Sequence, residues 1–134
     1  MPPKIEPLPF STTRPASAIK PVLLVAFLLY LIIAAYTMLH HELWGDELHS
    51  WNMARDSNSL ADLLHHKRYE GHPPIWSLIL WLTSKATHSL FWMQVIHLAI
   101  AMLVVGLILF YAPFPVFARV LLPFGYYFLY EYAI

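Results

Sequence analysis

The chain alternates between long apolar runs and one short charged stretch. The segments 21–39 and 90–112 are predominantly apolar and contain no aspartate, glutamate, lysine or arginine. A helix over 21–39 rises about 28 Å, close to the roughly 30 Å hydrocarbon core of a membrane. A third apolar run occupies 120–134. This pattern predicts an all-α, polytopic protein with transmembrane spans at 21–39, 90–112 and 120–134.

Two further segments differ from these spans. Residues 1–20 are polar and rich in proline, which predicts a disordered N-terminus. The apolar run at 73–84 is too short to cross a membrane, and Trp76 and Trp81 suit a membrane interface. We therefore expect an interfacial helix over 73–88. A helix that continued through its C-terminal end could still cross, so both courses stay open.

The polar stretch 40–72 is predicted to be a loop that contains short helices. Asp46 begins a segment with acidic residues in its first turn, where the helix dipole favours them. Ser59, three residues before an acid, is typical of a helix N-cap. We expect the helix that follows to lie against the membrane surface and to place three side chains on one face, those of Leu60, Leu63 and Leu64.

Composition supports a membrane protein. Hydrophobic residues make up 59% of the chain and charged residues 12%, against about 25% charged residues in soluble domains. The formal net charge is zero, so nothing indicates a nucleic-acid partner. Cysteine is absent, which excludes disulfides and thiolate metal sites.

The positive charges favour one orientation. Lys4, Arg14 and Lys20 precede the first predicted span, and positive charge prefers the cytoplasmic side. We therefore expect residues 1–20 in the cytoplasm and the charged loop 40–72 outside the cell. The loop also carries lysine and arginine, so charge alone does not decide the orientation.

The loop holds most of the acidic residues of the chain. Asp46 follows the first span, and Glu70 and His72 come just before the next apolar helix, so these groups are expected to meet at the membrane surface. A carboxylate near a low-dielectric surface can have its pKa raised toward the range useful for a general base. Two carboxylates and an imidazole also suit a divalent metal. Charged loops are usually just solvated surfaces, so these residues alone do not select a function.

Three polar residues lie inside predicted spans. Gln94 and His97 share one helix face, which predicts hydrogen bonding within a helix bundle. Glu131 lies about 16 Å into the third span, and an acid at that depth is a candidate functional residue. A metal or proton site in a transporter would account for Glu131 and His97, but not for the charged loop.

The order of motifs resembles a known enzyme family. The stretches concerned are WGDELHSW, LADLL, RYEGHPPIWSLILWL and FWMQVIHLAIAML, within 21–134. They look like the N-terminal part of the polyprenyl-phosphate-sugar-dependent membrane glycosyltransferases of the GT-C class. This class includes protein mannosyltransferases and the lipid A aminoarabinose transferase, and the chain most resembles its bacterial RgtA/B/C/D-like branch. No single motif is specific, and the order and spacing carry the resemblance.

The resemblance implies roles for individual residues. Asp46 would act as general base toward the acceptor or hold the metal and acceptor in place, with Glu47 as its catalytic neighbour. Glu70 and His72, together with Asp46, would bind a divalent metal cation. The resemblance does not specify Lys85. Lys85 is a candidate for stabilising the departing phosphate, although a lysine extending to the interface is the commoner arrangement.

The resemblance also implies a function and a location. We expect a partial GT-C fold that moves a sugar from a lipid-linked donor to an acceptor hydroxyl, at the outer side of a bacterial inner (plasma) membrane. The sugar, lipid and acceptor are not specified. GT-C enzymes have many more spans, so the chain is expected to be an N-terminal fragment, inactive alone. The alternative is a small non-catalytic integral membrane protein or subunit that packs against other helices.

Overall fold

The computed structural model describes residues 16–68, 70–71 and 73–131, except for the side chains of 16–18 and 130–131. The described residues form helices and short connections, with no strand among them, which confirms the predicted all-α class. In chain order the elements are α1 (Ala16–His40), α2 (Gly45–Asp56), α3 (Leu60–Lys67), α4 (Ile75–Ala86), α5 (Phe91–Tyr111), α6 (Val116–Leu121), the 3₁₀ turn η1 (Leu122–Phe124) and the π-helical turn η2 (Tyr127–Glu131).

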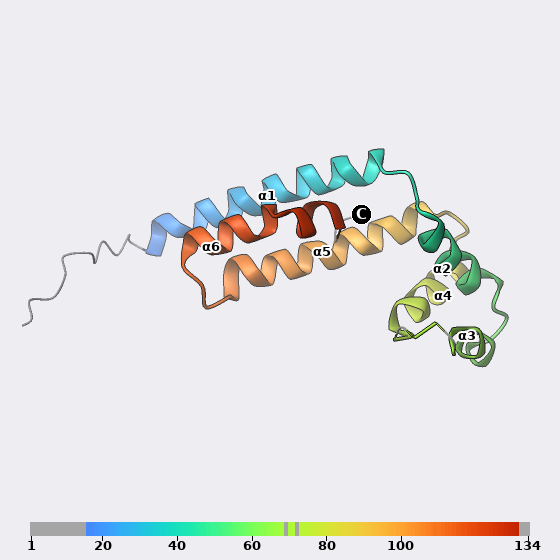
Figure 1. Cartoon of the computed structure of the whole chain (residues 1–134). Helices are drawn as coiled ribbons and strands as arrows, with labels where there is room; N and C mark the ends of the chain where they lie inside the picture. The colour runs from blue at the N-terminus through green and yellow to red at the C-terminus, as the bar shows by residue number, and fades with distance from the viewer. Residues whose placement is uncertain (1–15, 69, 72, 132–134) are drawn as a thin grey trace, which may run out of the picture.

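The two longest helices, α1 and α5, lie side by side and form a hairpin (Figure 1). Both are long and apolar enough to cross a membrane. Their contact is built from side chains that recur every three or four residues, which places them on one helix face. The buried set is Leu23, Ala26, Tyr30, Ala34, Val105 and Leu109. Most of each helix remains uncovered by protein, as expected for helices that face lipid.

The ends of these helices differ slightly from the expected spans. Residues 16–20 already belong to α1, so the expectation of disorder is wrong for this part of the N-terminus. Residues 1–15 lie outside the described part of the chain. Helix α5 agrees with the expected helix at 90–112 within one residue at each end.

The third apolar run is not a continuous helix within the described residues. Helix α6 ends at Leu121, Pro123 lies in η1, and Gly125 separates η1 from η2. Proline lacks a backbone donor and glycine weakens helices, so this sequence interrupts the helix expected from residue 120. Tyr30 Oη donates to the Phe128 carbonyl at 2.6 Å and fixes η2 against α1. Residues 132–134 lie outside the description, so a third crossing stays a prediction.

Helices α2, α3 and α4 form a head at the end of the hairpin where α1 ends and α5 begins (Figure 1). Its core contains Trp51, Ala54 and Leu80, together with Met93 from the first turn of α5. Helix α4 has 12 residues and rises about 18 Å, which is too short to cross the hydrocarbon core. It lies within the expected helix at 73–88 and packs mainly on α2, while its place at a membrane interface stays a prediction.

The start of α3 follows its sequence signal. Ser59 Oγ accepts a hydrogen bond from the Asp62 amide at 3.2 Å, as the N-cap pattern indicates. The three leucines share one face of α3, as their spacing indicates. Contact of this face with the membrane surface stays a prediction. Leu63 is fully buried, whereas Leu60 and Leu64 are 45% and 43% exposed. Helix α3 has 8 residues, and Leu63 is the one that it buries.

Candidate functional site

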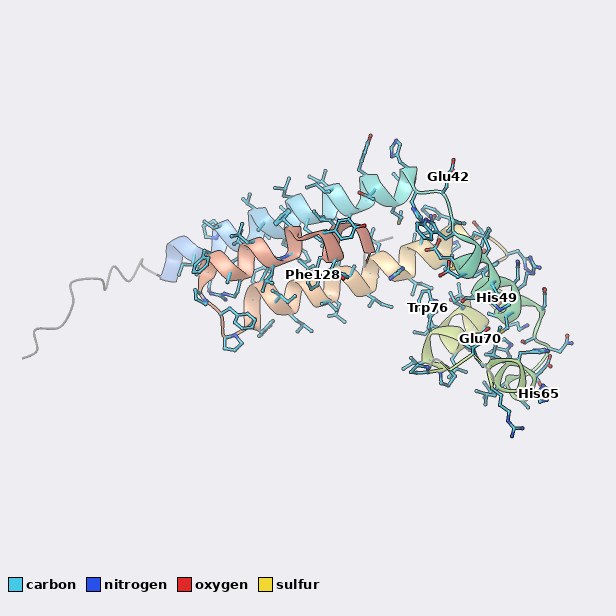
Figure 2. All side chains as sticks on the ribbon, in the orientation of Figure 1. Glu42, His49, His65, Glu70, Trp76 and Phe128 are labelled. Carbon is cyan, nitrogen blue, oxygen red and sulfur yellow. The ribbon has the colours of Figure 1, made fainter. Side chains whose placement is uncertain are left out.

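Some of the acidic residues of the loop line an open cleft of about 740 Å³ in the head. Helix α2, the end of α3 and the start of α4 form its walls. The lining residues are Asp46, Glu47, His49, Ser50, Lys67, Glu70, Pro73, Ile75 and Trp76. His49, Glu70 and Trp76 lie close together in Figure 2. The adjacent acids Asp46 and Glu47 therefore line one cleft together with Glu70, which lies on the other side of α3 in the sequence. All three were selected from the sequence.

Both carboxylate oxygens of Glu70 are engaged. Oε1 lies 3.0 Å from His49 Nε2, and Oε2 accepts a hydrogen bond from Lys67 Nζ. The Lys67 side chain is 8% exposed and the Glu70 side chain 24%, so this ion pair is partly shielded from water. The hydrogen bond from Lys67 outweighs partial desolvation and holds the pKa of Glu70 below its usual value. For Glu70, the neighbouring Lys67 cation thus opposes the upward shift of the pKa that burial alone would cause.

Asp46 and Glu47 occupy the first turn of α2, where unpaired amides favour negative charge. Glu47 Oε2 accepts a hydrogen bond from the amide of the N-cap residue Trp44 at 2.8 Å and lies 3.4 Å from His41 Nε2. A glutamate at the third helical position that accepts a hydrogen bond from the N-cap amide forms half of a capping box. This hydrogen bond fixes the Glu47 side chain. Asp46 is exposed at the cleft and accepts one hydrogen bond at Oδ1, from the Glu47 amide at 3.1 Å. Asp46 is therefore the acid better placed to meet a substrate.

The expected metal site is formed only in part. Asp46 and Glu70 line the same cleft, while His72 lies outside the described residues. Across residues 16–68, 70–71 and 73–131, no cluster of three or more histidine, aspartate or glutamate side chains could hold a metal ion. Both oxygens of the Glu70 carboxylate already contact His49 or Lys67. In this conformation the carboxylate is therefore not available as a metal ligand. A divalent cation stays a prediction.

Lys85 does not line the cleft. Its Nζ donates to the Ser57 carbonyl at 2.9 Å and lies 5.4 Å from the centre of the Trp81 ring. Trp81 Nε1 donates to the same carbonyl at 3.0 Å, so Lys85 helps to fasten α4 to the end of α2. The lysine that lines the cleft is instead Lys67, which the sequence argument missed. The sequence signal that could have identified this lysine was its spacing of three residues from Glu70, which suits an ion pair.

Glu131 is the last residue of η2, and its side chain lies outside the described part of the structure. The hydrogen bond between Tyr30 and the Phe128 carbonyl holds the beginning of this turn against α1. A functional role for Glu131 therefore stays a prediction.

A second cavity of about 70 Å³ lies between the head and α5. Glu47, Trp76, Met93, Gln94 and His97 line it, so Glu47 and Trp76 border both the cleft and the inner cavity. The rings of Trp76 and His97 lie 5.5 Å apart between centroids. Gln94 and His97 thus share one helix face, as expected, and that face is turned toward the head.

The fold defines an all-helical protein with two helices long and apolar enough to cross a membrane and a polar head that carries a cleft. No protein-family model, curated protein or solved structure matches the chain.

Proposed function

We propose that the chain is the N-terminal part of a GT-C membrane glycosyltransferase. It would move a sugar from a polyprenyl-phosphate donor to an acceptor hydroxyl at the outer surface of a bacterial inner membrane. One observation carries this proposal. The acids that the motif order selects, Asp46, Glu47 and Glu70, line one cleft at the end of the two long helices.

The walls of the cleft suit an amphiphilic donor. Charged and polar side chains from α2 and the end of α3 form one side. Pro73, Ile75 and Trp76 form an apolar side, and Ile75 is exposed. A lipid-linked sugar could place its isoprenoid chain toward the apolar side and its phosphate and sugar toward the charged side. With α1 entering from the cytoplasm, this cleft would face the outer leaflet.

The chemistry assigns distinct roles to these groups. Asp46 would take the proton of the acceptor hydroxyl while the hydroxyl oxygen attacks the anomeric carbon of the sugar. The bond from that carbon to the phosphate oxygen breaks, and the phosphate leaves with the electron pair. Lys67 and His49 line the cleft, can carry a positive charge and can donate hydrogen bonds to the departing phosphate. Glu70 holds both donors in place.

The test is Asp46→Asn in the gene product, expressed in native cells that lack the wild-type gene. A general base contributes about 10²–10⁴-fold, so we expect sugar transfer to fall at least about 100-fold at unchanged membrane abundance. Mass spectrometry of the lipid-linked sugars and their glycan products would measure this. Asp56→Asn is the matched control, since Asp56 pairs with Arg55 outside the cleft. Wild-type transfer by the Asp46→Asn protein would end the proposal.

One observation favours the alternative of a non-catalytic membrane subunit. An apolar groove of about 400 Å³ runs between α1 and α5, and Gly106 lies in its lining beside Phe27. Small residues permit close approach of another membrane helix. In that case the protein would tolerate Asp46→Asn and depend on Gly106 instead, so that Gly106→Leu would disrupt assembly while Asp46→Asn would not.

A further inference from the structure

Helix α6, which carries Arg119, lies at the end of the hairpin that is remote from the head (Figure 1). Arg119 Nη1 donates a hydrogen bond at 3.1 Å to the carbonyl of Leu109, which belongs to the last turn of α5. The last four carbonyls of a helix have no partner within the helix, and a basic side chain can satisfy one of them. This contact therefore caps α5 and holds the guanidinium beside the helix end.

The rest of the Arg119 guanidinium lacks a partner within the described part of the chain. Its Nε is buried and has no hydrogen-bond partner there. None of the ion pairs between described side chains includes Arg119. A guanidinium stays charged and carries five N–H donors, so Arg119 can still bind an acceptor. The acids with described side chains all lie in the head or in the connection to it: Glu42, Asp46, Glu47, Asp56, Asp62 and Glu70.

The surroundings of Arg119 suit the boundary between hydrocarbon and lipid headgroups. Tyr111 at the end of α5 is exposed, and so are Phe114 and Phe117. Exposed aromatic side chains are enriched where a membrane protein meets this boundary. A ligand at Arg119 would therefore have a charged headgroup and an apolar part beside these rings.

A second cation, Lys20, belongs to the same end of the hairpin. Lys20 is exposed on α1, and its neighbour Ile19 packs against the same apolar cluster as Val116 of α6. Among the described side chains, this end of the hairpin therefore carries positive charge and no carboxylate. With α1 entering from the cytoplasm, it would meet the inner leaflet, whose anionic lipids attract basic residues.

We propose that Arg119 binds the phosphate of an anionic phospholipid at this end of the hairpin, with Lys20 as a second positive charge. Nη1 is occupied by the Leu109 carbonyl, which leaves the edge formed by Nε and Nη2. The parallel N–H bonds of such an edge match two oxygens of one phosphate group. Nε is covered while Arg119 as a whole is partly exposed, so a small rotation of the side chain presents this edge to the headgroup. This lipid site does not depend on sugar transfer.

The first test uses the full 134-residue chain in maltoside micelles with ¹⁵N-labelled arginine. NMR would follow the Nε–H signal of Arg119, assigned with Arg119→Lys, while dioleoylphosphatidylglycerol is added. We expect this signal to shift until it saturates, and to shift less with dioleoylphosphatidylcholine or inorganic phosphate at the same concentration. An Arg119 signal that phosphatidylglycerol leaves unchanged would overturn the proposal. An equal response to phosphatidylcholine or to inorganic phosphate would overturn it as well, because the site would then not select an anionic lipid.

Variants would measure what each cation contributes to phosphatidylglycerol binding. Arg119→Gln should weaken binding about tenfold or more, because it removes hydrogen bonds from a charged donor. Arg119→Lys should restore part of the affinity, since lysine keeps the charge without the paired donors. Lys20→Gln should weaken binding about fivefold or less.

Arg55→Gln is the matched control, since Arg55 pairs with Asp56 in the head, and its affinity for phosphatidylglycerol should equal that of the wild type. Circular dichroism would verify equal helix content in all variants. If Arg119→Gln bound phosphatidylglycerol as tightly as the wild type, Arg119 would not be the lipid site. A loss of affinity in Arg55→Gln equal to that in Arg119→Gln would likewise refute a site at the hairpin end.

Discussion

The hairpin of α1 and α5 and the head of α2, α3 and α4 are stabilised by different interactions. Long-range polar contacts are few in the described part of the hairpin and its α6–η2 return. Tyr30 Oη bonds the Phe128 carbonyl, and Arg119 Nη1 bonds the Leu109 carbonyl at 3.1 Å. The head instead contains the ion pair between Lys67 and Glu70 and the N-cap hydrogen bond of α3. It also contains the Ser57 carbonyl, which accepts hydrogen bonds from the side chains of Trp81 and Lys85. Large apolar side chains cover the outside of the hairpin.

This difference follows from the surroundings that each region requires. In lipid, burying an apolar side chain between helices gains little, because lipid is equally apolar, so close packing and a few hydrogen bonds hold helices together. In water, burial of apolar surface is the main driving force. A head in contact with water should therefore depend on its buried side chains more strongly than the hairpin depends on its polar contacts.

The largest effect should come from removing the centre of the head core. Trp51 is 1% exposed, so Trp51→Ala should cost about 3–5 kcal/mol of head stability. Hydrogen exchange in bilayers should show α2 amides losing protection while the amides of α1 and α5 keep theirs. Trp44→Ala is the control, because Trp44 is 61% exposed. Equal loss of protection in the head and the hairpin would contradict the separation of the two regions.

A smaller effect is expected from the hairpin. Tyr30→Phe removes the hydroxyl that binds the Phe128 carbonyl and should cost about 1 kcal/mol. Exchange of the η2 amides should accelerate, while exchange in the head stays unchanged. Tyr36→Phe is the matched control, since Tyr36 is exposed on the same helix. If both variants behave alike, the hydrogen bond does not hold η2 in place.

The sequence predicted the hairpin better than the head. Length and apolarity alone define α1 and α5, and both signals are local. The acids of the cleft were also found, because they cluster between apolar runs. The sequence did not predict the ion pair between Lys67 and Glu70. It also did not predict that Glu47 lines both the cleft and the second cavity. These depend on how α2, α3 and α4 pack, which spacing along the chain does not determine.

The broken helix after α6 shows a second limit. Apolar composition indicated a span from residue 120, although Pro123 and Gly125 were both visible in the sequence. Membrane helices tolerate proline and glycine when neighbours supply hydrogen bonds. Here Tyr30 supplies one such bond, to the Phe128 carbonyl. The outcome therefore depended on a partner 98 residues away in the sequence.

The smallest effect, and the one that depends on pH, concerns Glu70. Lys67 lowers the pKa of Glu70 in the folded protein, so the folded state favours the ionised form. This stabilisation is fully present above the unfolded value of 4.5 and is lost as pH falls through the lower folded value. At pH 7, Glu70→Gln should cost about 0.5 kcal/mol, within the range of ion pairs near the surface. The difference from the wild type should shrink as the solution is acidified below about pH 4.

Denaturant titrations in mild detergent at pH 7, 5 and 3.5, followed by tryptophan fluorescence from the head, would measure this difference. Glu42→Gln is the control, because Glu42 is an exposed acid in the connection between α1 and α2 and does not line the cleft. Its effect on the free energy of unfolding should stay near zero at each pH. If the cost of Glu70→Gln instead grew on acidification, Glu70 would be protonated in the folded head. The ion pair with Lys67 would then not distinguish the polar head from the apolar hairpin.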